Sequence, residues 1–294
     1  MAKCFETINL IHPTKEVEKK FNLSKHLNLY IKVEKFLCLS MIASFIIFNF
    51  SSVIASVVHW WHNGKYLYLM QMPTVFPVPL NESFLEYIIY FILESCTDFL
   101  MVISTLSCDI CLVSVVSILC LHFDLLSQKI LELKPKENES LNKLVNIAKQ
   151  HNVILRLAKD FDNLFSPSII FSLLSSSFIL CFCTYQVLDE TAFIGIFKAF
   201  VLIVYEMKQV VLICYFGQKL IDASSQICHV LYMHNWVDGS LKYKKIVLFM
   251  MMCTQRPFTL NVVGISNISM ETLKGVRQFL FFLDKIQAIN QQTQ

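Results

Sequence analysis

The sequence predicts an all-α, multi-pass helical membrane protein, and three observations carry this prediction. Of its 294 residues, 55% are hydrophobic and 16% are charged, whereas soluble proteins contain about 45–50% apolar and about 25% charged residues. The mean hydropathy is +0.55. Residues 37–58 contain no charge and are long enough to cross a hydrocarbon core of about 30 Å as a helix. These features argue against three other classes of protein: a cytosolic enzyme, a DNA-binding protein and a disulfide-stapled secreted domain.

The first half of the chain alternates between apolar runs and mixed segments. Residues 1–36 contain seven lysines and no long apolar run, so we expect a cytoplasmic segment without a cleavable signal peptide. A membrane helix is predicted at 37–58 and an extracellular loop at 59–84. The helix predicted at 85–122 is longer than any bilayer requires at about 1.5 Å per residue, and we expect its end to extend into the cytoplasm.

The second half continues the same pattern. We expect a cytoplasmic, anchor-like loop and helix at 123–166, because apolar residues recur there at helical spacing. Ser166 and Pro167 mark the entry to a membrane helix at 167–188, and another is predicted at 192–217. A cytoplasmic segment with a helix follows at 218–257. The apolar segment at 258–289 is interrupted by charges such as Glu271 and Lys274, which suggests a last membrane helix that lines a pore.

The basic residues predict which ends of the helices face the cytoplasm. The successive segments outside the four clear membrane helices contain seven, one, seven, zero and five Lys or Arg residues. Cytoplasmic loops carry the excess of Lys and Arg. The N-terminus and the segments 123–166 and 218–257 are therefore predicted to be cytoplasmic. Asn81 begins an Asn-Glu-Ser sequon in the predicted outer loop, which makes it a candidate glycosylation site.

Acidic residues stand inside the second predicted membrane helix. Glu94, Asp98 and Asp109 fall on one narrow face at about 100° per residue, so we expect this face to meet protein or water rather than lipid. The acids form either a polar wall of a ligand pocket or an interhelical network. The same two interpretations apply to the charged residues of the fourth membrane helix, Lys198, Glu206 and Lys208.

No motif of the sequence predicts an enzyme, a cofactor or a metal. Cys108 and Cys111 form a CxxC without a second pair, and His59 and His62 form an HxxH without further histidine boxes. The chain also lacks a Gly-rich phosphate loop and a GxSxG motif. Net charge of +3 is no nucleic-acid signature, so no nucleic-acid partner is expected.

The C-terminal third resembles the signature region of the insect odorant receptor family. The segment Cys214–Gly217 resembles the CYFG-type motif of the family, and Tyr232 and Trp236 follow at its spacing. Gln255-Arg256-Pro257 resembles its Q-[KR]-P motif, and Ser269-Met270-Glu271 resembles its S-L-E motif. The resemblance covers roughly residues 30–285.

This resemblance implies an odorant receptor-like bundle with about five of the usual seven membrane helices. The chain is expected to lack the first two, as an incomplete gene model or a non-functional truncated receptor would. The resemblance implies a small volatile odorant as ligand and a non-selective cation channel built with the shared odorant co-receptor as a hetero-tetramer. It implies the plasma membrane of olfactory sensory neurons as the location. Ile286 falls near the gate of the pore, and the implied odorant-binding residues are Phe50, Ile54, Val57, Tyr87, Tyr90, Phe91, Glu94, Phe197, Phe200 and Val201.

Three alternatives remain at this stage. A gustatory receptor of the same superfamily differs mainly in the C-terminal signature. A G-protein-coupled receptor would place the N-terminus outside, which reverses the observed charge pattern. A transporter or membrane enzyme would show flux or turnover without a co-receptor.

Overall fold

The computed structural model describes residues 23–64, 84–137, 139–189, 193–262 and 266–267. Within these residues it contains five α-helices, one 3-10 helix and a two-residue antiparallel strand pair. The predicted all-α, multi-pass class is confirmed. The first part of the predicted N-terminal segment, most of the predicted outer loop and nearly all of the predicted last membrane helix lie outside the described residues.

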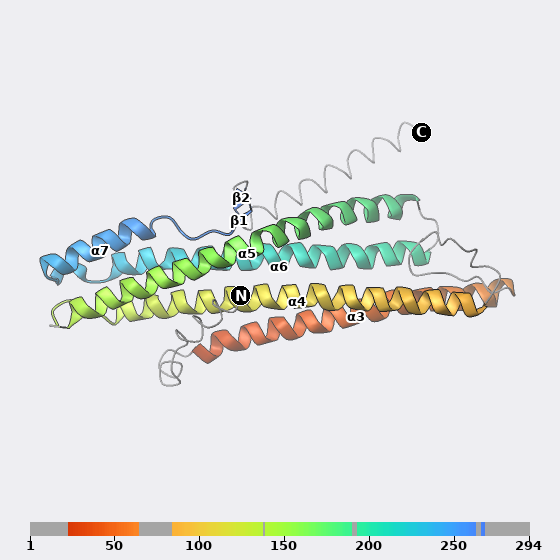
Figure 1. Ribbon diagram of the computed structural model, residues 1–294, viewed down its shortest axis with the longest axis horizontal. Helices are drawn as coiled ribbons and strands as arrows, with labels where there is room; N and C mark the ends of the chain where they lie inside the picture. Colours follow the sequence, from red (N-terminus) through yellow and green to blue (C-terminus); the bar gives the residue numbers. More distant parts are fainter. Residues whose placement is uncertain (1–22, 65–83, 138, 190–192, 263–265, 268–294) are drawn as a thin grey trace, which may run out of the picture. The chain divides into compact units, whose positions relative to one another are not determined.

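Four long helices dominate the chain (Figure 1). They are α3 (Leu23–Asn63), α4 (Phe84–Leu131), α5 (Ser140–Asp189) and α6 (Phe193–Met233). The 3-10 helix η1 (Trp236–Asp238) and the short helix α7 (Leu241–Thr254) follow, and then the strands β1 (Asn261–Val262) and β2 (Ser266–Asn267). All four long helices contain a stretch long and apolar enough to cross a membrane.

Each long helix extends well beyond the apolar run from which it was predicted. With 41 to 50 residues, these helices reach roughly 60–75 Å, about twice the hydrocarbon thickness of a bilayer. The predicted helix 37–58 lies within α3, and the predicted helix 85–122 lies within α4, which continues to Leu131. Polar residues follow the apolar runs without a helix-breaking sequence, so the helices continue past them.

Helix α5 contains two segments that the sequence predicts one after the other. The predicted cytoplasmic helix and the predicted membrane helix at 167–188 form one continuous helix, and Pro167 lies inside it. Proline removes one backbone donor from the helical ladder, but membrane helices tolerate this loss where neighbouring groups satisfy the freed carbonyl. Lys134 and Pro135 lie in the break between α4 and α5.

The chain divides into two compact units, and each long helix contributes to both. Unit 1 contains residues 1–30, 113–174 and 209–294, and unit 2 contains residues 31–112 and 175–208. Unit 1 has a densely packed apolar core. Its fully buried side chains include Leu119, Phe123, Leu126, Ile130, Leu144, Phe216, Leu220, Ile227, Leu231, Tyr243 and Val247.

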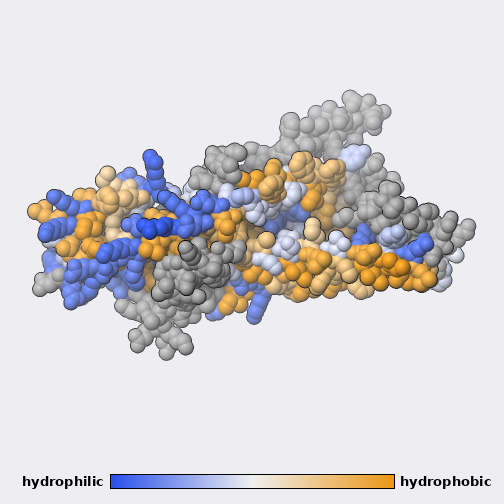
Figure 2. Space-filling model, in the orientation of Figure 1, coloured by the Kyte–Doolittle hydropathy of each residue, from blue (hydrophilic) through white to orange (hydrophobic). Residues whose placement is uncertain are grey.

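Unit 2 leaves most of its large apolar side chains exposed. Examples are Phe36, Ile42, Phe50, Leu93, Leu100, Phe178, Phe182 and Phe200. Figure 2 shows hydrophobic residues over the helices of this unit, whereas hydrophilic residues gather around the start of α5. Continuous apolar exposure on this scale is unfavourable in water and is expected of helices that face lipid.

Hydroxyl side chains within the apolar helices bond to their own helix. Ser44 Oγ donates to the Ser40 carbonyl at 2.9 Å, and Ser56 Oγ donates to the Ser52 carbonyl at 3.0 Å. Thr97 Oγ1 makes the same bond to the Leu93 carbonyl at 2.9 Å. Because these hydroxyls are satisfied locally, they can face lipid at little cost.

In unit 1, α7 is held to the end of α6 by one buried polar contact. His234 Nε2 and the Tyr243 hydroxyl lie 2.7 Å apart, and Tyr243 is fully buried. Burial raises the pKa of Tyr243 to about 12 and lowers the pKa of His234 below its usual 6.5. Gly239 is required here, because an added Cβ would lie 2.7 Å from Tyr243 Cδ1.

The segment after α7 is also attached to α6. Ser224 Oγ accepts a hydrogen bond from the Phe258 backbone N–H at 2.9 Å. The Ser240 side chain accepts from the Tyr243 backbone N–H at 3.3 Å and so caps the N-terminus of α7. These two serines fix both ends of the path that the chain takes around α7.

Candidate functional site

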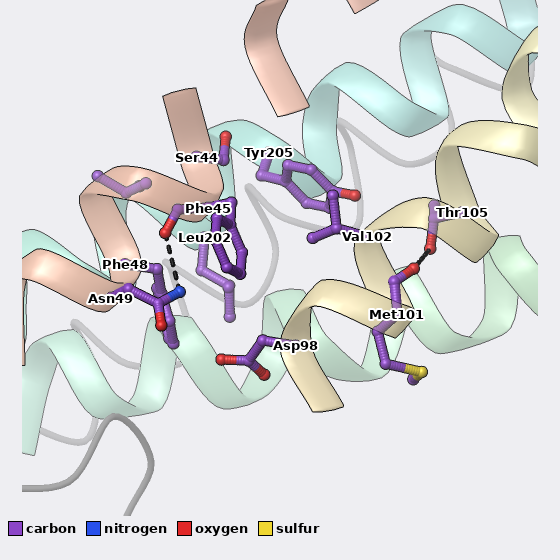
Figure 3. Close-up of a pocket in the computed structure, with 11 residues that line it drawn as sticks. Ser44, Phe45, Phe48, Asn49, Asp98, Met101, Val102, Thr105, Leu202 and Tyr205 are labelled. Atoms are coloured by element: carbon purple, nitrogen blue, oxygen red, sulfur yellow. Dashed lines mark hydrogen bonds between the residues drawn. The ribbon is translucent and has the colours of Figure 1, made fainter. Parts of the chain in front are cut away.

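Unit 2 contains a partly open cleft between α3, α4 and α6, with a volume of about 200 Å³. Figure 3 shows how side chains from the three helices converge on it. The lining is mostly apolar and aromatic, with a few polar groups. It consists of Ser44, Phe45, Phe48, Asn49, Asp98, Met101, Val102, Thr105, Val201, Leu202 and Tyr205.

Helix α3 presents one face to the cleft. Ser44, Phe45, Phe48 and Asn49 follow one another at helical spacing, so they fall on the same side of α3. The Asn49 side-chain amide donates to the Phe45 carbonyl at 3.0 Å, which fixes its orientation. Phe45 also packs edge-on against Phe99 of α4, with ring centroids 5.9 Å apart.

Helix α4 contributes Asp98, Met101, Val102 and Thr105, which lie three or four residues apart and therefore share a face. Thr105 Oγ1 donates to the Met101 carbonyl at 2.9 Å. Asp98 differs in one atom of its carboxyl group. Its Oδ2 atom is shielded from solvent and has no hydrogen-bond partner among the described residues, and in Figure 3 its carboxyl group extends from α4 into the cleft.

Helix α6 closes the cleft with Val201, Leu202 and Tyr205. The Tyr205 hydroxyl donates to Met41 Sδ at 3.0 Å. The Nζ atom of Lys208, one turn further along, lies 4.4 Å from the centroid of the Tyr205 ring, a favourable cation–π distance. The tyrosine ring is therefore held in place from both sides.

Other ionisable side chains of unit 2 are engaged beside the cleft. Lys198 Nζ donates to Ser52 Oγ at 2.7 Å. Ser176 Oγ donates to Glu206 Oε2 at 2.6 Å, and both residues are buried. These lysine and glutamate side chains are not part of the lining. The intramembrane charges thus include both a network between helices and, at Asp98, a group in the wall of a cavity.

The arrangement suits a small, largely apolar ligand with one polar group. Ligand sites typically combine an apolar, aromatic lining with a few oriented polar side chains. The volume of about 200 Å³ lies below the roughly 300–1,000 Å³ of common ligand pockets. The described lining residues contain no arrangement of nucleophile, base and oxyanion donors.

Of the ten predicted odorant-binding residues, Val201 is the one that lines this cleft. Five of the others expose between 44% and 60% of their surface, namely Phe50, Ile54, Val57, Phe197 and Phe200. Tyr87, Tyr90, Phe91 and Glu94 are half-buried on α4, with the Tyr87 and Phe91 rings 6.0 Å apart. Glu94 interacts electrostatically with Asp98 and Lys198. The predicted pore residue Ile286 and glycosylation site Asn81 lie outside the described residues.

The lining residues on α3 were missed by the sequence analysis. Ser44, Phe45, Phe48 and Asn49 lie in an uncharged run where hydropathy gives every residue nearly the same weight. One signal was available, because Asn49 is the only amide between residues 37 and 58, and a polar residue in a membrane helix usually faces protein. The same reasoning did single out Asp98.

Comparison with known proteins agrees with the resemblance found in the sequence. The family model described as 7tm Odorant receptor matches residues 2–281. Odorant receptor 85f of Drosophila melanogaster is 26% identical over 242 residues, which cover 81% of this chain and 62% of that receptor. The chain thus spans less than two thirds of the length of this relative.

Solved structures show the same fold. The insect olfactory receptor OR5 from Machilis hrabei superimposes with a TM-score of 0.77 at 14% identity, over 97% of this chain and 74% of that receptor. Its complex with eugenol gives a TM-score of 0.73 at 14% identity, over 92% and 70%. The family match extends over nearly the whole sequence, and the chain therefore belongs to the 7tm odorant receptor family, a family of multi-pass membrane receptors rather than enzymes.

Proposed function

We propose that this chain is an odorant-binding subunit and that the cleft between α3, α4 and α6 holds a small volatile odorant. The carrying observation is a cavity of about 200 Å³ within membrane helices, lined by Phe45, Phe48 and Tyr205 with a single acidic group, Asp98. The related receptor from Machilis hrabei was solved in complex with eugenol, a small volatile molecule of the kind that such a lining accommodates.

The proposal extends to assembly and location. The subunit works with the shared odorant co-receptor in a hetero-tetramer that opens as a ligand-gated, non-selective cation channel. It resides in the plasma membrane of olfactory sensory neurons, surrounded by lipid, with its N-terminus in the cytoplasm. Family membership and the alternation of basic segments support this picture. The segment 258–289 lines the pore, with Ile286 near the gate, and Asn81 carries the outer glycan.

The ten residues predicted from the resemblance extend the proposed site beyond the cleft. Val201 belongs to its wall. Tyr87, Tyr90, Phe91 and Glu94 lie on α4 before Asp98, where they would meet an odorant on its way to the cleft. Phe50, Ile54 and Val57 continue α3 beyond Asn49, and Phe197 and Phe200 precede Val201 on α6.

A pair of matched variants tests whether the cleft is the odorant site. Val102→Phe adds a ring inside the cleft, whereas Leu100→Phe adds a ring at a position that is 67% exposed on the same helix. Both receptors are expressed with the co-receptor, and odorant-evoked cation current is recorded across a broad odorant panel. We expect Val102→Phe to abolish the responses of the wild-type channel and Leu100→Phe to preserve them.

Surface labelling must show equal amounts of all three receptors at the membrane. A wild-type chain that reaches the surface and stays silent across the panel contradicts the proposed activity. Equal responses of the two variants would instead leave the activity intact and remove the cleft as its site.

A further inference from the structure

Asp98 Oδ2 is the one buried side-chain oxygen or nitrogen among the described lining residues of the cleft that has no hydrogen-bond partner. This atom is shielded from solvent. By contrast, the side chains of Ser44, Asn49 and Thr105 donate to backbone carbonyls of their own helices at 2.9, 3.0 and 2.9 Å. Buried polar groups in proteins are almost always paired, so the exception indicates that a partner from outside the chain is expected.

The charges around Asp98 indicate what that partner carries. No lysine or arginine lines the cleft. Lys198 is bonded to Ser52 at 2.7 Å and interacts electrostatically with Glu94. Glu94 is also the charged group that faces Asp98, so the pair adds negative rather than positive charge. A carboxylate in such a site is strongly stabilised by a cation that enters the cleft.

The rest of the lining suits an organic cation rather than a metal ion. Phe45, Phe48 and Tyr205 offer aromatic surface, and an ammonium group is attracted both by ring faces and by a carboxylate. Metal ions such as Mg²⁺ and Ca²⁺ require several oxygen ligands, and Asp98 is the only carboxylate among the lining residues. The apolar walls would hold the hydrocarbon part of the same ligand.

We propose that the cleft selects small organic amines, which bind as ammonium ions and donate a hydrogen bond to the Asp98 carboxylate. This inference rests on the proposed function, in which the cleft is the ligand site, and it adds the chemical class of the ligand. Simple alkylamines are cationic at neutral pH, as the lysine side chain is. A neutral odorant of the same shape fills the apolar walls equally well but leaves the carboxylate without a counter-charge.

Binding of two probes of matched shape tests the inference. Full-length receptor in lipid nanodiscs is titrated at pH 7 with 2-phenylethylamine and with 2-phenylethanol, and ligand binding is followed by saturation-transfer NMR. The receptors compared are the wild type, Asp98→Asn and Asp109→Asn. Asp109 is a matched control because it is a buried acid of the same helix outside the cleft lining.

We expect the wild type to bind the amine about tenfold or more tightly than the alcohol, as for a charge-assisted hydrogen bond. Asp98→Asn should remove this preference while still binding the alcohol, and Asp109→Asn should retain it. A wild type without preference for the amine overturns the inference, and so does a preference that survives in Asp98→Asn.

The same experiment separates this inference from the proposed function. Amine binding that depends on Asp98 supports the inference even where no current is evoked in cells with the co-receptor. The opposite result is also possible: Val102→Phe abolishes the odorant-evoked currents, but the receptor shows no preference for the amine. That result supports the proposed site and contradicts only the assignment of the ligand class.

Discussion

The two units of this chain are built from the same four helices but fill the space between them differently. Unit 1 buries large apolar side chains, among them Phe123, Phe216 and Tyr243. Unit 2 buries fewer large apolar side chains, Leu37 and Met41 among them, together with polar ones such as Ser176 and Glu206, and it contains the cleft. Many of its large apolar side chains, including Phe50 and Phe182, are exposed.

We expect this difference of a unit 1 that lies mainly in water and a unit 2 that lies mainly in lipid. In water, burial of apolar surface drives helices together, so a core of large side chains is the effective design. In lipid this driving force between helices is lost, and close contact of small residues with interhelical hydrogen bonds takes its place. We therefore expect unit 1 to depend on apolar volume and unit 2 to depend on particular polar pairs.

The largest expected effect is in the core of unit 1. Tyr243→Ala removes a fully buried ring, and replacement of a buried aromatic residue by alanine costs about 3–5 kcal/mol. The thermal unfolding midpoint of the receptor in nanodiscs should fall, and hydrogen exchange should rise in α7 and in the 209–233 part of α6. Leu241→Ala, at a position that is 78% exposed on the same helix, should change neither. Equal acceleration of exchange throughout residues 31–63 would break the distinction between the units.

The next largest effect should come from a polar pair of unit 2. Ser176→Ala leaves the buried Glu206 carboxylate without the hydroxyl that donates to it at 2.6 Å, and an unpaired buried polar group costs about 1–3 kcal/mol. The thermal unfolding midpoint measures this loss. Ser177→Ala is the matched control, because Ser177 is the exposed neighbour of Ser176. If the two variants melted at the same temperature, polar pairing would not be what distinguishes unit 2.

The contrast between the units also shows which parts of the fold were predictable. Charge-free runs such as residues 37–58 identify membrane helices because no other structure satisfies the backbone in lipid. The full length of α3 was not predicted, because the segment before its apolar run has ordinary mixed composition. Ser166 and Pro167 mark the predicted entry to the membrane helix, and Pro167 lies inside the continuous helix α5. A proline signals a missing donor, and only the neighbouring structure decides whether the helix ends there.

The part of the candidate site that contains a charged residue was predictable from the sequence. Asp98 stands out in an apolar run, and the structure places it in the wall of the cleft. The rotation of α3 about its axis could not be read in the same way, because Phe45, Phe48 and Phe50 are equally apolar. Two of these rings line the cleft, whereas Phe50 is 60% exposed. Packing against α4 and α6 decides between them, and that information is absent from hydropathy.

A smaller effect is expected at acid pH, where titration of His234 should lower the stability of unit 1. Burial lowers the pKa of His234, which lies 2.7 Å from the Tyr243 hydroxyl. In the unfolded chain, His234 binds a proton near pH 6.5. In the folded unit 1 it binds this proton only at a lower pH. Stability is therefore complete above about pH 6.5 and declines as the pH falls toward the lowered folded value. Thermal unfolding between pH 5 and 8 measures the decline, and His234→Gln should flatten it. An unchanged slope in that variant would assign the decline to other groups.

The smallest effect is expected at the surface of unit 1, where Lys136 Nζ lies 3.4 Å from Asp238 Oδ2. The side chains of both residues are more than half exposed, at 77% and 57%, and exposed ion pairs contribute about 0–1 kcal/mol. Asp238→Asn should therefore shift the unfolding midpoint by little, and added salt should remove even that shift because it screens exposed charges. Ser176→Ala changes no charge, so its larger effect should persist in salt. Asp238→Asn could instead lower the unfolding midpoint as much as Ser176→Ala does, also in salt. Solvent exposure would then not explain the different strengths of polar contacts in the two units. The expected pattern instead assigns the larger energetic contribution to the buried Ser176–Glu206 pair of unit 2.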